Sequence, residues 1–170
     1  MIYNFKDNSP QIASNSWVAP SADIIGHVVL EEESSIWYQS VLRADNNSIV
    51  IGKRSNIQDG CVLHVDTHTK IEICEDVSVG HRVVLHGCYV GKGSLIGMGA
   101  ILMNGVVIGS GCLVAAGSVL LENTSYPDGT LIAGLPGKVK RNLTEEEKEF
   151  ILENARIYVR LSAEARKSAP

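Results

Sequence analysis

The sequence predicts a mainly β protein whose chain winds into a parallel β-helix built from hexapeptide repeats, followed by one C-terminal helix. An aliphatic residue recurs at every sixth position, most plainly at Val90, Ile96 and Ile108. The chain has 170 residues, of which 45% are hydrophobic and only 5% aromatic, and it contains 16 glycines. A repeat of this kind is typical of a solenoid, in which residues one coil apart become vertical neighbours.

The register of the hexads can be followed along most of the chain from the aliphatic residue that opens each one. Two insertions interrupt it, at 45–48 and at 65–70. Three hexads make one coil, so the sequence predicts six coils over residues 12–125. The opening residues are Ile12, Val18, Ile24, Leu30, Ile36, Leu42, Ile51, Ile57, Leu63, Ile73, Val79, Leu85, Val90, Ile96, Leu102, Ile108, Val114 and Leu120.

Within each hexad, the opening residue and the small residue at the fifth position are expected to point inward, and glycines to occupy the tight corners. Cys61 and Cys112 stand at such fifth positions, and no pair of cysteines has C-x-x-C spacing. We therefore interpret the four cysteines, which include Cys74 and Cys88, as small core residues and not as disulfides or metal ligands.

The C-terminal part carries the signature of a helix. Thr144, with Glu147 three residues later, has the spacing of a capping box, and an amphipathic run follows to about Ala163. We expect a helix over 142–163 that packs along the β-helix. The Pro- and Gly-rich residues 126–141 are interpreted as the connecting loop. Residues 1–170 are thus expected to form a single domain.

Charge and hydropathy exclude two classes of partner. The formal net charge is −4 and the basic residues are scattered, so no stripe is available for a phosphate backbone. No apolar tract of about 20 residues could span a bilayer. The first residues lack the basic segment and apolar run of a secretory signal. We expect no nucleic acid, no membrane and a cytoplasmic location.

The register brings polar residues together in two ladders. Arg43, His64 and His86 each follow an opening residue on one face, so they should stack outward about 4.8 Å apart. A second ladder on the adjoining face contains Tyr38, Asp59 and His81 in that order.

Two imidazoles one rung apart suit a zinc ion, because a tetrahedral metal holds its nitrogen ligands at about 2.0–2.1 Å. His64 and His86 form such a pair, whereas His81 points away from them. Three protein ligands and one open position are typical of catalytic zinc, so a third histidine must come from another copy of the chain. A cyclic homotrimer with a metal at each subunit interface satisfies this requirement. The alternative is a cluster of imidazoles that pair with aspartates at a trimer interface.

Five segments of the chain carry motifs of a known family: Leu42–Asp45, Asn56–Gly60, Leu63–His64, Val79–Cys88 and Leu131–Val139. They closely resemble the γ-class carbonic anhydrases and their relatives, which are also described as hexapeptide transferases or ferripyochelin-binding proteins. The resemblance covers nearly the whole chain and implies a left-handed β-helix. It also implies a homotrimer whose metal is held by His64 and His86 of one subunit and His81 of its neighbour.

The reaction implied by this resemblance is the reversible, metal-dependent hydration of CO₂ to bicarbonate. A divalent metal lowers the pKa of bound water toward neutrality, which yields the attacking hydroxide. Zinc is the expected metal, and Fe²⁺ or Co²⁺ would also suit three imidazoles. By resemblance, Gln58 hydrogen-bonds the metal-bound hydroxide, and Arg43, Asp45 and Asp59 form an ion-pair network between subunits. A purely structural role for these ion pairs is an equal alternative.

The sequence departs from the founding members of the family in two places. The acidic loop that carries their glutamate proton shuttle is reduced here to Val65–Lys70, and Asn46 stands where they have a second glutamate. Proton export would fall to Asp66, His68 or buffer, so we expect slow turnover. Tyr158 on the C-terminal helix either approaches the site or packs against the β-helix.

Two other functions compete with CO₂ hydration. Many proteins of this fold transfer acyl groups from coenzyme A or hydrolyse its thioesters, and a fold alone does not choose the chemistry. The other alternative is a non-enzymatic scaffold that binds metal without turnover. Metal content separates the first alternative from the metal-dependent functions, and CO₂ turnover separates an enzyme from a scaffold.

Overall fold

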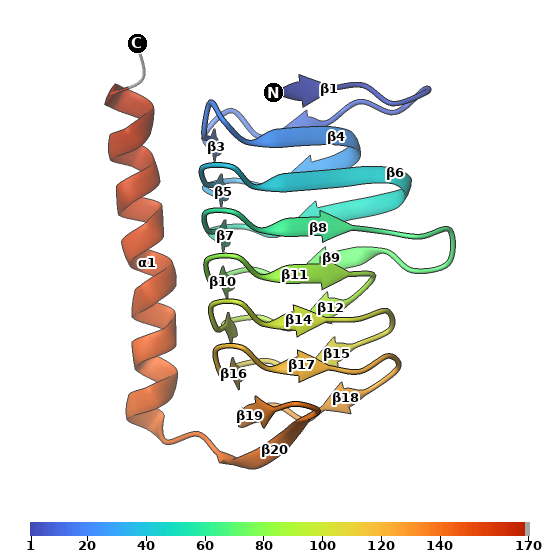
Figure 1. Ribbon diagram of the computed structural model, residues 1–170. Helices are drawn as coiled ribbons and strands as arrows, with labels where there is room; N and C mark the ends of the chain where they lie inside the picture. The colour runs from blue at the N-terminus through green and yellow to red at the C-terminus, as the bar shows by residue number, and fades with distance from the viewer. Residues whose placement is uncertain (169–170) are drawn as a thin grey trace.

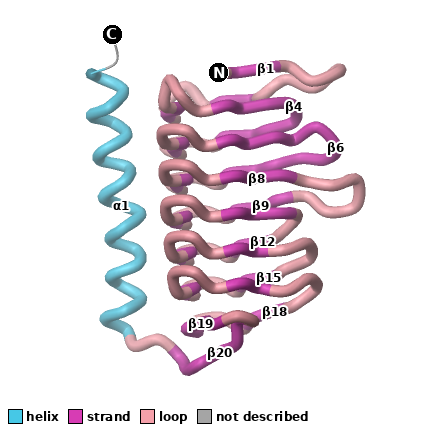
Figure 2. Tube along the Cα trace, in the orientation of Figure 1, coloured by secondary structure: helices cyan, strands magenta, loops and turns pink. Residues whose placement is uncertain are grey.

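The computed structural model describes residues 1–168, and it confirms a parallel β-helix of about seven turns with one C-terminal helix. The coils stack along one axis and wind left-handed, with short strands joined by tight corners (Figures 1 and 2). The strands are β1 (Ile2–Tyr3), β2 (Gln11–Ile12), β3 (Trp17–Val18), β4 (Asp23–Leu30), β5 (Ser35–Ile36), β6 (Val41–Ile51), β7 (Asn56–Ile57), β8 (Val62–His64), β9 (Ile71–Ile73), β10 (Ser78–Val79), β11 (Val84–His86), β12 (Tyr89–Val90), β13 (Leu95–Ile96), β14 (Ile101–Leu102), β15 (Val107–Ile108), β16 (Leu113–Val114), β17 (Val119–Leu120), β18 (Ser125–Tyr126), β19 (Thr130–Gly134) and β20 (Gly137–Asn142).

The strands form three faces. One face, which we call the histidine face, stacks the first part of β6 with β8, β11, β14 and β17. A second face stacks the last part of β6 with β9, β12, β15 and β18, and the long strand β6 joins the two. The third, the helix face, runs β3-β5-β7-β10-β13-β16-β19 and is the one beside the C-terminal helix (Figure 1).

The predicted register is confirmed at every rung from Ile12 to Leu120. Each opening residue pairs with the one three hexads later. On the histidine face, for example, Leu42 pairs with Leu63 and Leu63 with Leu85. From Ile24 onward the opening residues are buried and form one narrow aliphatic core, against which the partly buried Ile12 and Val18 pack. The core sets the height of each rung and therefore decides which outward residues meet.

The expectation of a connecting loop over 126–141 is wrong. The hexad spacing continues through Tyr126 and Ile132, which pair with Ile108 and Val114 and add a further turn to the six predicted. The Pro- and Gly-rich residues 127–129 make a corner of this turn, and Gly129 adopts a positive φ of 68° there. Strand β20 then folds back antiparallel on β19. This hairpin covers the open end of the stack, where an unpaired edge would otherwise remain.

The C-terminal helix α1 spans Glu145–Ser168, so it begins three residues later than expected and extends beyond Ala163. The predicted capping box is present, because the Thr144 hydroxyl accepts from the Glu147 N–H and the Glu147 carboxylate accepts from the Thr144 N–H. The helix runs back along the helix face toward the N-terminal coils (Figure 1). Ile151 and Ala155 on its inner side are buried.

Two expectations about individual positions need correction. Corners are not reserved for glycine, because residues such as Arg54, Arg82 and Asn123 also adopt φ near +60°. Cys61, Cys88 and Cys112 are buried as expected, whereas Cys74 is half-buried and its thiol contacts the Tyr89 hydroxyl at 3.1 Å. The four thiols are free. Within residues 1–168, no helix has the length and apolar character needed to cross a bilayer.

Candidate metal centre

His64 and His86 lie side by side on the histidine face. They end β8 and β11 and occupy matching positions in the parallel ladder, with Arg43 on the rung before them. The His64 Nδ1 atom lies 2.9 Å from the His86 Nε2 atom, and the ring centroids are 4.9 Å apart. The ladder predicted from the sequence therefore brings two imidazole nitrogens face to face.

Asp45 determines which nitrogen of His64 carries the proton. Its carboxylate lies 3.0 Å from His64 Nε2 and also bonds Arg43. Burial acts to raise the pKa of Asp45, but the hydrogen bond from His64 and the positive charge of Arg43 outweigh burial and leave that pKa below its ordinary value. An ionised carboxylate only accepts hydrogen bonds, so His64 Nε2 donates and Nδ1 keeps its lone pair.

Asn104 determines in the same way which nitrogen of His86 carries the proton. It did not stand out in the sequence as a candidate site residue. Its side-chain Oδ1 lies 2.7 Å from His86 Nδ1, and its Nδ2 donates to Asp66 at 2.9 Å. The Nδ1 atom of His86 is therefore the donor, and Nε2 keeps its lone pair. Asn104 is hard to identify as a site residue from the sequence, because an asparagine followed by a glycine is typical of an ordinary turn.

Two lone pairs that face each other at 2.9 Å repel unless a proton or a metal ion lies between them. Ligand histidines in metal sites donate their second N–H to a carboxylate or carbonyl, as both rings do here. The donor set therefore fits a metal ion as half of a site. Within residues 1–168 no group of three His, Cys, Asp or Glu side chains is arranged to hold a metal.

His81 lies away from this pair, at the corner that follows β10 on the helix face, as the sequence predicted. Its Nδ1 atom is 2.9 Å from the carboxylate of Asp59, on the neighbouring rung. Both side chains are 42% exposed. The structure therefore divides the predicted residues into two groups: Arg43, Asp45, His64 and His86 on one face, and Gln58, Asp59 and His81 at the adjoining corner.

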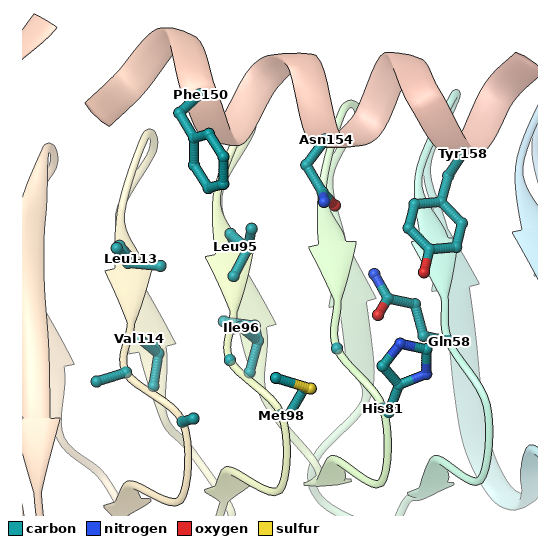
Figure 3. Close-up of a pocket in the computed structure, with 14 residues that line it drawn as sticks. Gln58, His81, Leu95, Ile96, Met98, Leu113, Val114, Phe150, Asn154 and Tyr158 are labelled. Carbon is teal, nitrogen blue, oxygen red and sulfur yellow. The ribbon is translucent and has the colours of Figure 1, made fainter. Parts of the chain in front are cut away.

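The corner with His81 opens into a pocket of about 450 Å³ between the helix face and α1 (Figure 3). Gln58 and His81 lie at its polar end, and Tyr158 points its hydroxyl toward them from α1 (Figure 3). The remaining walls are mainly apolar: Leu95, Ile96, Met98, Leu113, Val114, Ala115, Ala116 and Phe150.

Gln58 is held in a fixed orientation at this polar end. It is only 6% exposed, and its Nε2 donates to Asn56 Oδ1 at 3.1 Å. Asn56 in turn donates to Ser78 Oγ at 2.9 Å, which fixes its own amide. The side-chain oxygen of Gln58, Oε1, therefore remains as a hydrogen-bond acceptor at the pocket. Asn56, which supports it, did not stand out in the sequence as a functional residue.

Tyr158 packs against the β-helix and also reaches the pocket, so both sequence interpretations describe it. Its ring meets Trp37 edge to face, with centroids 5.2 Å apart. Burial, followed by the negative charge of Asp59, raises the pKa of Tyr158. The hydroxyl therefore stays protonated and can donate a hydrogen bond at neutral pH.

The short loop 65–70 does not present a free carboxylate. Asp66 accepts hydrogen bonds from the backbone N–H groups of His68 and Thr69, each at 2.8 Å. These bonds and that of the Thr69 hydroxyl lower the pKa of Asp66 to about 2. A carboxylate held this way is a poor proton carrier near neutral pH. His68 is exposed beside it.

Comparison with known proteins places the chain among hexapeptide-repeat proteins and carbonic anhydrases. Residues 87–122 match the family model described as "Bacterial transferase hexapeptide (six repeats)". The chain is 46% identical over 147 residues to the carbonic anhydrase of Geobacillus kaustophilus, which covers 86% of this chain and 81% of that protein. It is 42% identical over 168 residues to mitochondrial γ carbonic anhydrase 2 of Arabidopsis thaliana, covering 95% of this chain and 60% of that longer protein.

A solved structure named a hexapeptide transferase family protein, from Anaplasma phagocytophilum, superposes with a TM-score of 0.92 at 37% identity. The match covers 95% of this chain and 96% of that one. The fold and the hexapeptide repeat define a protein of the hexapeptide β-helix class. More narrowly, the chain belongs to the γ-class carbonic anhydrase family of that class.

Proposed function

We propose that this protein is a metal-dependent enzyme that reversibly hydrates CO₂ to bicarbonate. The observation that carries the proposal is the pair of imidazole nitrogens, His64 Nδ1 and His86 Nε2, which face each other at 2.9 Å. Asp45, which also bonds Arg43, holds His64 from one side. The names of the relatives, carbonic anhydrases of bacterial and plant origin, support the same reaction.

A homotrimer with His81 donated by a neighbouring copy completes the ligand set. His81 is exposed at a corner, where another protomer can approach it. The histidine face carries an exposed apolar stripe beside the pair, formed by Val62, Val84 and Ile101. A second copy would bury this stripe. In a closed ring of three copies, the His81 corner of each protomer would meet the His64–His86 pair of one neighbour.

Zinc, or Fe²⁺ or Co²⁺ in its place, would supply a hydroxide at neutral pH by lowering the pKa of water. The chain's own residues would arrange the reactants around it. The side-chain oxygen of Gln58 would accept a hydrogen bond from the attacking hydroxide and so help to point the hydroxide lone pair toward the carbon of CO₂. Ile96 and the other apolar walls favour uncharged CO₂ over bicarbonate. The Tyr158 hydroxyl is placed to donate to a substrate oxygen.

The proposal predicts about one divalent metal ion per chain in protein purified without chelators, measured by elemental analysis. Stopped-flow measurement of CO₂ hydration should then show turnover that follows metal content. We expect the rate to be low, because the hydrogen bonds that Asp66 accepts keep its carboxylate ionised. Only the exposed His68 or buffer is then left to carry protons away. Metal-loaded trimers without turnover would support the scaffold instead, and protein that takes up no metal would end the proposal.

Acyl transfer or thioester hydrolysis on coenzyme A is the second candidate. The apolar pocket of about 450 Å³ is far larger than CO₂ requires, and its walls would accommodate an acyl chain. The Anaplasma protein, named as a transferase, shares the fold. Calorimetric titration of the zinc-loaded protein with acetyl coenzyme A separates the two candidates. An acyltransferase or thioesterase should bind acetyl coenzyme A saturably, whereas an enzyme that hydrates CO₂ should not.

A further inference from the structure

We propose that Asp66 and Asn104 together select the metal-competent form of His86, with the proton on Nδ1 and the lone pair on Nε2. The inference rests on the proposed metal site. It gives the short loop 65–70 a positioning role in place of the proton-shuttle role considered from the sequence.

The first step is the anchoring of Asp66. One carboxylate oxygen, Oδ1, accepts from the backbone N–H groups of His68 and Thr69 at 2.8 Å each. The other oxygen, Oδ2, is left to face Asn104, whose Nδ2 donates to it at 2.9 Å. The loop backbone thus fixes which oxygen is presented to Asn104.

The second step is the orientation of the Asn104 amide. A carboxylate has no proton to give, so a reversed amide would place its oxygen against Asp66 Oδ2. The observed orientation avoids this repulsion and turns Asn104 Oδ1 toward His86 Nδ1, 2.7 Å away. That oxygen only accepts, so His86 must keep its proton on Nδ1.

The third step is close packing. Gly87 follows His86 directly, and its backbone accepts from the Gly105 N–H at 2.8 Å, which ties the Asn104 corner to the histidine strand. A Cβ atom at Gly87 would lie 2.0 Å from Thr69 Oγ1 and 2.4 Å from Asn104 Oδ1. The loop, the corner and the strand therefore pack closely around Gly87 and leave no space there for a side chain.

The substitution Asp66→Asn tests the inference at a residue that does not touch His86. The new amide keeps one oxygen for the loop N–H groups and turns its NH₂ toward Asn104. The Asn104 amide then reverses, offers its own NH₂ to His86 Nδ1 and favours the proton on Nε2. We expect zinc affinity to fall about 10- to 100-fold, as it does when partners behind a ligand are lost. Competition with a chromophoric chelator measures it.

A compensating double variant gives the sharpest control. In Asp66→Asn/Asn104→Asp the carboxylate at position 104 accepts from both the amide at position 66 and His86 Nδ1. Zinc affinity should return to within a few-fold of the original. Asp128→Asn is the matched single control, because Asp128 also accepts a backbone N–H, from Ser110 at 2.8 Å, but lies in another corner. It should leave zinc affinity unchanged.

Nitrogen-15 NMR of the imidazole rings reports the protonated nitrogen of His86 without relying on activity or on metal. The original protein should carry the His86 proton on Nδ1, and Asp66→Asn should move it to Nε2. A folded Asp66→Asn protein with the original affinity and ring signals would overturn the inference while leaving the proposed function intact. So would a loss that the double variant does not restore. If the original protein binds no zinc, the proposed function fails. The ring signals then still test whether Asp66 and Asn104 keep the His86 proton on Nδ1.

Discussion

His81→Ala is expected to empty the metal sites as completely as His64→Ala, although position 81 lies on a different face from the His64–His86 pair. Each proposed site draws one ligand from the corner of a neighbouring protomer, so either substitution leaves two imidazoles where catalytic zinc takes three protein ligands. Metal analysis of each purified variant, under the same chelator-free conditions, measures the effect.

Mixing the two variants distinguishes a shared site from two independent effects. In a mixed trimer, an interface between an intact His64–His86 pair and an intact His81 is complete, so part of the metal binding should return. His27→Ala is the matched control, because His27 is exposed and lies outside both histidine groups. It should retain full metal content. Mixed trimers that stay empty would contradict the shared ligand set.

Gly87→Ala is expected to have the second largest effect, on both stability and metal affinity. Gly87 adopts a φ of 54°, where a side chain costs about 1–2 kcal/mol. Its new Cβ would also collide with Thr69 and Asn104, which must move and release His86. We expect a loss of unfolding free energy above that backbone cost and at least a tenfold loss in zinc affinity. Chemical denaturation and chelator competition measure the two.

Gly111→Ala separates the two causes. Gly111 has a similar φ of 62°, and a Cβ atom there would meet nothing within 4 Å. It lies in a corner away from both histidine groups, where its N–H donates to the Lys92 carbonyl. This variant should show the backbone cost alone and bind zinc normally. If Gly87→Ala and Gly111→Ala lost the same stability and both kept full zinc affinity, the packing account of the His86 support would be wrong.

The period of six was enough to predict the core and the ladder of the histidine face. Once Leu63 and Leu85 are stacked, His64 and His86 must lie beside each other, because each directly follows a core residue in a parallel strand. The same logic placed His81 above Asp59 at the adjoining corner. These residues were predictable because their neighbours are fixed by the repeat.

Residues supplied by loops and corners were not predictable in this way. Asn104 reaches His86 from a corner, and Asp66 reaches Asn104 from an insertion of irregular length, so neither position follows from the repeat. The last turn was missed for a related reason. Residues 127–129 look like a linker by composition, although Tyr126 and Ile132 keep the hexad spacing on either side of them.

The most direct test of the account is a crystal structure of the zinc-loaded protein with anomalous data at the zinc edge. We predict one anomalous peak per chain at each subunit interface, about 2.0–2.1 Å from His64 and His86 of one protomer and from His81 of its neighbour. An assembly in which the three imidazoles do not converge on a common peak would contradict it.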